Sequence, residues 1–158
     1  MSEGGVLFSI VAVNMSLASL AGLVIAFRRT GAWAMYDIYR LRQIVEWGFS
    51  GVLLALAGFP LASWLGGEAA AIRLLGAIAL AYLTLNLLLL TRRRAAVRDV
   101  VRLTPLVATI DLSAIAFATA TLILATMTAW QLALLALTAR PMIAFLMVLS
   151  TLGREDPE

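Results

Sequence analysis

The chain has 158 residues, of which 63% are apolar and 13% are charged, whereas a soluble domain carries about 25% charged residues. A soluble fold of this length could not bury so much apolar side chain, so the composition predicts an all-α, polytopic transmembrane helix bundle. The chain contains neither Cys nor His, which excludes disulfides, thiol catalysis, structural zinc sites and Ser-His-Asp triads.

The apolar stretches predict five spans within a single integral membrane domain over residues 1–158. The first, Val6 to Phe27, contains 22 uncharged residues, enough to cross a hydrocarbon core of about 30 Å. We do not expect it to be a signal peptide, because the residues before it are acidic where a signal would be basic. The spans are expected at about 6–27, 44–65, 69–91, 106–128 and 130–152, with cytoplasmic loops at 28–43 and 92–105.

The last two spans are the least defined by the sequence. One continuous helix over 104–152 would be about 73 Å long, too long for any bilayer. With five spans, a tight turn near Ala129 and Trp130 would leave Trp130 in the interface and Arg140 opposite Ala118. That is about 10 Å along the axis from Asp111. The alternative is four spans plus an interfacial C-terminal segment, with Leu112 to Ala139 as the last span.

Arginine predicts the orientation. All twelve basic residues are Arg, and nine lie in the two expected cytoplasmic loops, against Arg73 alone on the opposite side. Positive loops stay inside, so the N-terminus is expected outside. We expect these arginines to contact anionic lipid phosphates and not nucleic acid, because they flank apolar spans. They are Arg28, Arg29, Arg40, Arg42, Arg92, Arg93, Arg94, Arg98 and Arg102.

The two loops share a pattern, since Asp37–Leu41 and Asp99–Leu103 both read Asp-apolar-apolar-Arg-Leu when Tyr39 counts as apolar. On a helix, Asp and Arg at i and i+3 can pair. Each loop could therefore be a short amphipathic helix at the membrane surface. The pattern fits either a duplicated helical hairpin or two loops that converged on the same chemistry.

Polar residues at membrane depth are the best pointers to function, because an ionised side chain at the bilayer centre costs about 2.5–3.5 kcal/mol on insertion scales. Asp111 has apolar neighbours and no Arg at i±4, so it needs a partner on another helix, water or a proton. Arg140 would lie near mid-depth with five spans, and Pro141 beside it favours a broken helix. Glu46 can pair with Arg42, four residues before it.

Two asparagines complete the candidate intramembrane site. Asn14 heads a face of small residues with Ala18, Gly22 and Ala26, and Asn86 shares a face with Tyr82, so both could form hydrogen bonds between helices. In the fourth span, 12 of 23 residues are Ala, Thr or Ser. That composition predicts the most enclosed helix of the bundle, packed tightly or lining a water-filled path.

The segment containing Arg28, Arg29, Trp33 and the stretch Tyr36–Glu46 resembles uncharacterised small bacterial polytopic membrane proteins. In those proteins a first span precedes an Arg-containing loop, and an acid begins the second span. The resemblance covers roughly the first 90 residues. It implies a bacterial origin and this topology, so we expect a multi-pass protein of the bacterial inner (cytoplasmic) membrane. The resemblance brings no activity.

The sequence is compatible with three functions. The first is a small oligomeric bundle that forms or gates a path for ions, protons or small solutes, lined by Asp111, Arg140 and the fourth span. The second is a non-catalytic accessory or assembly subunit of a larger membrane complex. The third, a membrane enzyme using Glu46 and Asp111, has no catalytic motif behind it, so we expect no enzyme, no cofactor and no metal. The expected partners are the bilayer, its anionic lipids, and further copies of the chain or another membrane protein.

Overall fold

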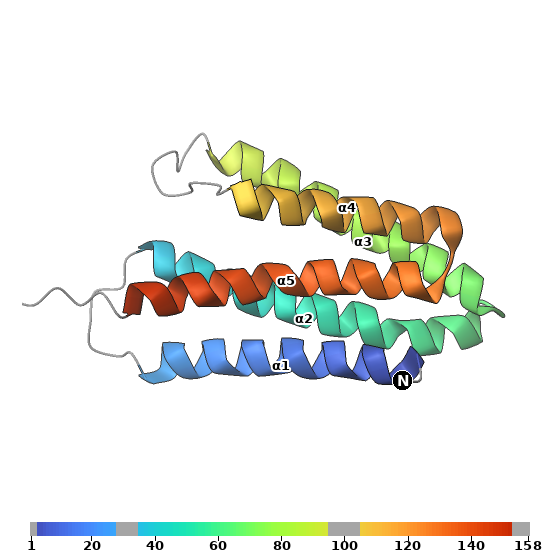
Figure 1. The fold of residues 1–158 in the computed structure, drawn as a ribbon, viewed down its shortest axis with the longest axis horizontal. Helices are drawn as coiled ribbons and strands as arrows, with labels where there is room; N and C mark the ends of the chain where they lie inside the picture. The colour runs from blue at the N-terminus through green and yellow to red at the C-terminus, as the bar shows by residue number, and fades with distance from the viewer. Residues whose placement is uncertain (1–2, 28–34, 95–104, 153–158) are drawn as a thin grey trace, which may run out of the picture.

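The computed structural model describes residues 3–27, 35–94 and 105–152, and every secondary-structure element within these ranges is helical. Consecutive helices run antiparallel (Figure 1). The N-terminus and the turns at 65–67 and 125–126 lie at one end of the bundle, hereafter the turn end. The predicted all-α fold is confirmed. The helices are α1 (Glu3–Phe27), α2 (Met35–Trp64), α3 (Glu68–Arg94), α4 (Pro105–Leu124) and α5 (Met127–Leu152).

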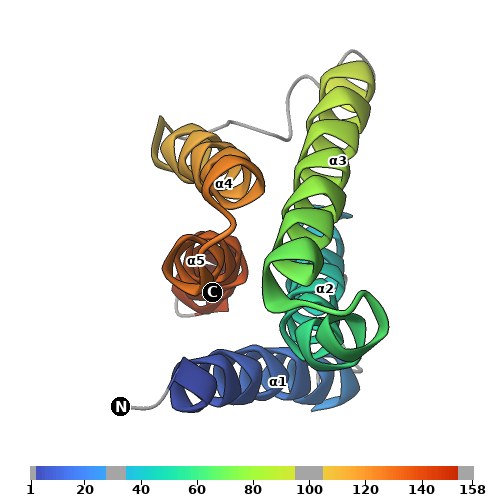
Figure 2. The ribbon, with the colours of Figure 1, turned by 90° about the vertical axis from the view of Figure 1, so that its right-hand side faces the viewer.

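The helices form three layers. The pair α2 and α5 makes the middle layer, α3 and α4 cover one side of it, and α1 covers the other (Figures 1 and 2). Within the described residues, helix α5 contacts all four other helices, whereas α4 contacts only α3 and α5. The expectation that the fourth span is the most enclosed is therefore wrong. Its small residues allow close approach to two neighbours, and its outer face carries exposed Leu112, Ile123 and Leu124.

Four helices are long and apolar enough to cross a membrane among the described residues, in the ranges Gly5–Val24, Leu41–Trp64, Glu68–Leu89 and Met127–Leu149. The apolar part of α4, Ala108–Leu124, is shorter. The whole of α4 has 20 residues and is about 30 Å long at 1.5 Å per residue. Exposed Leu, Phe and Ile side chains cover the outside of the bundle, as expected for helices surrounded by lipid.

The turn between α4 and α5 lies at Ala125 and Thr126, four residues before its predicted position. Ala125 has a φ of 51°, a left-handed conformation that usually takes Gly. The Thr126 hydroxyl accepts a hydrogen bond from the Ala129 N–H at 3.4 Å, as an N-cap does. Trp130 is 1% exposed and packs in the core of the bundle, and its expected place in the membrane interface stays a prediction. The predicted turn position was wrong because Gly, Pro or Asn usually mark a turn, and this turn contains none of them.

The first predicted cytoplasmic loop, 28–43, is shorter than expected. Helix α2 begins at Met35 and continues to Trp64 without a break, so Asp37–Leu41 belongs to the same helix as the second span. The matching stretch Asp99–Leu103 lies outside the described residues, and the duplication stays a prediction. The second loop, 92–105, is likewise shortened, because α3 extends to Arg94 and α4 begins at Pro105.

Glycine allows a close helix contact between α3 and α4. A Cβ added to Gly76 would lie 3.0 Å from the backbone nitrogen of Leu122 and 3.3 Å from the carbonyl oxygen of Ala118. Both are backbone atoms, which cannot move aside as a flexible side chain can. Gly76 therefore sets the separation of α3 and α4.

We predict that Gly76→Ala lowers the free energy of unfolding in detergent micelles by about 1–3 kcal/mol, because α4 must move away from α3. Gly22→Ala is the matched control, since no atom lies within 4 Å of the added Cβ, and it should leave stability unchanged or slightly raised. Equal losses for the two variants would show that helix separation at Gly76 is not limiting.

Candidate functional site

A buried ion pair joins α4 to α5. The Arg140 guanidinium donates a hydrogen bond from Nη1 to Oδ1 of Asp111 at 2.9 Å. The side chains are each 11% exposed. Asp111 thus has the partner on another helix that the sequence requires, and Arg140 neutralises it without a second copy of the chain.

The helix register explains why these two residues meet. Asp111 lies 14 residues before Ala125, and Arg140 lies 14 residues after Thr126. In an antiparallel hairpin, residues equally far from the turn lie at the same height. A turn near residue 129 would have left the pair about 10 Å apart along the axis, so the four-residue correction brings Asp111 and Arg140 together.

Helix α5 is continuous through the site. Pro141 is buried and lies inside the helix, where its missing N–H leaves the Leu137 carbonyl without its usual intrahelical donor. The expectation of a broken helix at Arg140 is therefore wrong. Neighbouring helices can hold a membrane helix together at a proline, and Pro141 packs among them.

Two aromatic side chains, one from α2 and one from α3, complete the site. Trp47 of α2 presents its ring to Arg140, with the guanidinium carbon 4.0 Å from the ring centroid, a cation–π contact. Tyr82 of α3 packs edge-on against Trp47, with centroids 5.4 Å apart, and its hydroxyl lies 3.1 Å from Oγ of Ser50. We name Trp47, Tyr82, Asp111 and Arg140 the polar layer, because each of the helices α2 to α5 contributes one member.

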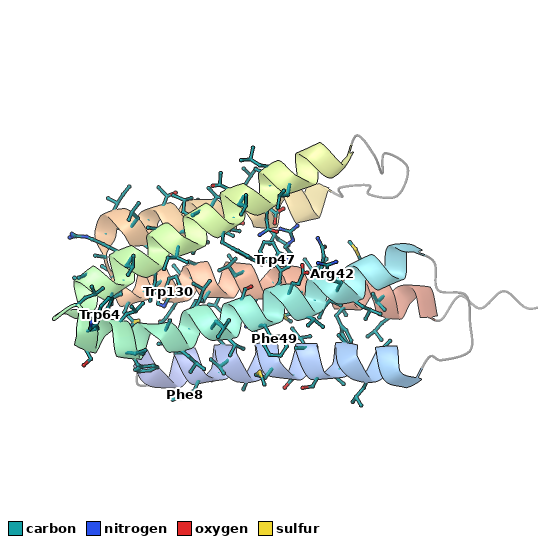
Figure 3. All side chains as sticks on the ribbon, turned by 180° about the vertical axis from the view of Figure 1, so that it is seen from behind. Phe8, Arg42, Trp47, Phe49, Trp64 and Trp130 are labelled. Atoms are coloured by element: carbon teal, nitrogen blue, oxygen red, sulfur yellow. The ribbon has the colours of Figure 1, made fainter. Side chains whose placement is uncertain are left out.

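Figure 3 labels Trp47 between α2 and the α3–α4 pair. Counted along α3, α4 and α5, the polar layer lies about 20 Å from the turn end. If the turn end lies at one face of a hydrocarbon core of about 30 Å, this distance puts the polar layer within the core and nearer its opposite face.

Glu46 is placed apart from this layer. Its Oε1 accepts a hydrogen bond from Nε of Arg42 at 2.6 Å, and the two side chains are 50% and 69% exposed. The predicted i, i+4 pair is thus present. Helices α2 and α4 are not in contact within the described residues, and the Glu46 and Asp111 carboxylates have separate basic partners. The structure does not bring them together as an acid–base pair.

Asn14 makes a hydrogen bond between helices at the centre of the bundle. Its Nδ2 donates to Oγ1 of Thr138 on α5 at 2.8 Å and to the carbonyl oxygen of Ile10 at 2.9 Å. Gly51 lies so close that an added Cβ would be 3.2 Å from Oδ1 of Asn14. This buried Oδ1 has no hydrogen-bond partner among the described residues.

The small-residue face of α1 differs from its prediction beyond Ala18. Ala18 and then Ala21 are buried, whereas Gly22 is exposed. The buried positions follow the helical period of 3.6 residues, and the predicted spacing of four drifts off the face.

The other predicted polar groups bond within their own helices. Asn86 donates from Nδ2 to the Tyr82 carbonyl oxygen at 3.0 Å. On α4, the hydroxyls of Ser113, Thr119 and Thr121 donate to carbonyl oxygens four residues earlier. A water path lined by these α4 hydroxyls is therefore not supported, because their protons are already donated to the backbone.

The arginines predicted to contact anionic lipids are described only in part. Arg42 pairs with Glu46, whereas Arg28, Arg29, Arg98 and Arg102 lie outside the described residues. Arg40 and Arg92 to Arg94 belong to the ends of α2 and α3. Lipid contact stays a prediction for the whole set.

A cavity of about 300 Å³ lies toward the turn end, between α1, α2, α3 and α5. Trp130 forms part of its wall, 10 residues and about 15 Å along α5 from Arg140. Between them, Ala133, Leu134 and Leu137 are buried, so an apolar layer separates the cavity from the polar layer. Within the described residues, no cluster of three or more acidic side chains could hold a metal ion.

Comparison with protein-family models, curated proteins and solved structures gives no match for this chain.

We predict that Asp111→Asn lowers the free energy of unfolding in micelles by about 3 kcal/mol, because it leaves a buried guanidinium without its anion. Replacing both partners by apolar residues, Asp111→Leu with Arg140→Met, should recover most of that loss, since neither charge then needs a partner. Glu46→Gln serves as the exposed control and should change stability by less than about 0.5 kcal/mol. A loss below about 1 kcal/mol for Asp111→Asn would contradict the pairing.

Proposed function

We propose that this protein is a small membrane-transport bundle in which α2 to α5 surround a path for ions, protons or small solutes. The polar layer provides the charged groups of the path. The apolar layer, which lies between the polar layer and the cavity, keeps the path closed in this structure. The single observation that carries the proposal is the buried Asp111–Arg140 pair, 2.9 Å apart, at a depth where charged groups mark ion and proton pathways.

The arrangement along the bundle supports this proposal. From the turn end inward, the chain provides a cavity and then the buried apolar side chains of Ala133, Leu134 and Leu137. The hydrogen bond between Asn14 and Thr138 follows, and then the ion pair with the Tyr82 and Ser50 hydroxyls nearby. Apolar constrictions close channels by excluding water, and charged side chains beside them select ions. The same helices α2, α3 and α5 contribute to both the cavity and the polar layer.

The topology that belongs to this proposal has five spans, with the turn end outside. The long sides of the bundle are apolar. The helix ends that the nine loop arginines belong to or adjoin in the sequence lie opposite the turns (Figure 1). The positive-inside rule then places that end in the cytoplasm. The resemblance noted from the sequence favours a bacterial inner membrane.

We predict that a reporter fused after Glu158 gives a cytoplasmic signal in a bacterial host, because α5 then crosses back to the arginine-rich side. A reporter fused between Gly66 and Gly67 should give a periplasmic signal and acts as the internal control. A periplasmic signal after Glu158 would overturn the five-span topology and, with it, the depth assigned to Arg140.

The transport proposal predicts that purified protein in liposomes conducts ions or protons above the lipid-only level. Asp111→Asn should change that flux severalfold or more, because it removes the anion of the polar layer, whereas the exposed Glu46→Gln control should leave it unchanged. Where Asp111→Asn does not fold, Asp111→Glu keeps the charge and shifts it by one methylene.

Flux at the lipid-only level for the folded wild type, tested over a range of pH and membrane potential, would overturn the proposal. The accessory-subunit hypothesis would then be favoured, and the polar layer would serve only to hold the four helices together.

A further inference from the structure

We infer that the species carried at the polar layer is a proton bound by the Asp111 carboxylate, and that the Trp47 ring holds Arg140 in place while Asp111 is neutral. This inference rests on the proposed transport function and deepens it, because it names the transported species and a positioning residue. Three features support it: the contacts of Arg140, the surroundings of Trp47, and the charges of the layer.

Arg140 contacts two partners of different kinds. Its Nη1 donates a hydrogen bond to Oδ1 of Asp111 at 2.9 Å, and its guanidinium carbon lies 4.0 Å from the centroid of the Trp47 ring. The attraction of the carboxylate depends on its charge and weakens when the acid is protonated, whereas the quadrupole of the ring is the same at every pH. Arg140 therefore keeps an attractive partner in both protonation states of Asp111.

The Trp47 ring is held by more than its cationic partner. Trp47 is 3% exposed. Tyr82 packs edge-on against it with the ring centroids 5.4 Å apart, and the Tyr82 hydroxyl lies 3.1 Å from Oγ of Ser50. At the next residue, a Cβ added to Gly48 would lie 3.2 Å from the carbonyl oxygen of Asn14, so this part of α2 packs closely against α1. Packing from α1 and α3 therefore keeps the ring in place independently of the ion pair.

The groups of the layer favour a proton over a metal cation or an inorganic anion. A hard cation such as Ca²⁺ is bound by about six to eight oxygen atoms, whereas the described part of the layer offers one carboxylate and the neighbouring Ser50 and Tyr82 hydroxyls. An anion bound to Arg140 would lie beside the Asp111 carboxylate, and the two negative charges would repel. A proton needs a single lone pair, and a carboxylate has about four, of which the hydrogen bond from Arg140 uses one.

The transfer step conserves atoms and charge. A hydronium ion on one side of the bundle gives its proton to a lone pair of the Asp111 carboxylate, and water is left behind. The carboxylate becomes a neutral acid, and the polar layer gains one positive charge. The carbonyl oxygen of the acid can still accept the hydrogen bond from Arg140, and Trp47 still faces the guanidinium. Loss of the proton to water on the other side, once the apolar layer opens, restores the ion pair.

The ionisable groups around Asp111 are few. Within the described residues α4 packs against α3 and α5, and Arg140 is the one charged residue of α5. On α3 the ionisable group of the layer is Tyr82, and the charged residues of that helix lie at least nine residues away, about 13 Å or more along the axis. Glu46 on α2 is exposed and pairs with Arg42, so the variant Glu46→Gln measures any contribution from that acid.

The test measures the flux of protons, Na⁺, K⁺ and Cl⁻ separately through the full chain in liposomes. We expect proton flux above the lipid-only level and flux of the other three ions at that level. Asp111→Asn should abolish proton flux because an amide takes up no proton in this range, and Glu46→Gln should leave it unchanged. Trp47→Leu should lower proton flux severalfold and move its half-maximal rate to lower pH, because a neutral Asp111 then leaves Arg140 without the ring.

Two further variants separate the ring from the size of the side chain. Trp47→Phe keeps an aromatic face and should recover most of the flux and of the pH profile. Trp64→Leu removes an indole that is 81% exposed and should change neither.

A second measurement does not depend on flux. In micelles, Trp47→Leu should lower the folding equilibrium constant about tenfold more in the Asp111→Asn background than in the wild type. The reason is that the ring matters more to Arg140 once the anion is gone.

The outcomes distinguish this inference from the function on which it rests. Flux of Na⁺, K⁺ or Cl⁻ at or above that of protons would overturn the inference and leave the transport proposal standing. An unchanged pH profile in folded Trp47→Leu, or an equal effect of that change in both backgrounds, would overturn the role of the ring. Absence of any flux would overturn the transport proposal and this inference with it. The wild type alone decides between the ions, so the test holds even where a variant does not fold.

Discussion

The ion pair between Arg140 and Asp111 is the interaction on which the bundle depends. Two charges placed inside apolar helices are tolerated only when they are paired and hydrogen-bonded. At 2.9 Å, the pair fixes the height of α5 against α4. Trp47 links α2 to the pair by placing its ring over the guanidinium. Tyr82 links α3 to α2 through its contacts with Trp47 and Ser50. One ionic contact thereby aligns four helices, while close packing at Gly76 and Gly51 sets how near they lie.

The two ends of the bundle differ in their polar groups. The polar layer is self-contained: its charges cancel, and its aromatic groups shield them from the apolar surroundings. The turn end, by contrast, contains a cavity, the acid Glu68 and the Trp130 indole N–H, which has no acceptor among the described residues. Asn14 and Thr138 lie between these regions and join α1 to α5 by a neutral hydrogen bond. The bundle therefore has its ion pair far from the turn end and its cavity close to it.

The sequence predicts the all-α class and singles out the residues of the ion pair, because apolar length and rare charges are strong local signals. It also predicts the Arg42–Glu46 pair and the hydrogen bond of Asn14 to another helix. The position of the α4–α5 turn could not be predicted, since Ala125 adopts a conformation that Ala rarely takes and no breaker residue marks it. Trp47 was missed as the partner of Arg140, and Tyr82 as the residue packed against Trp47, because contacts between α2, α3 and α5 depend on packing that no local pattern encodes.

The equal spacing of Asp111 and Arg140 from the turn has a consequence for how this chain can vary. One residue inserted within α5, between Met127 and Arg140, would rotate the following side chains by about 100° relative to those before it and move them by about 1.5 Å. Arg140 would then face away from Asp111 and Trp47, and Thr138 would leave Asn14. A residue added in the turn itself can be taken up by a longer loop. The number of helical residues between the turn and Arg140 is therefore constrained together with the identity of the charges.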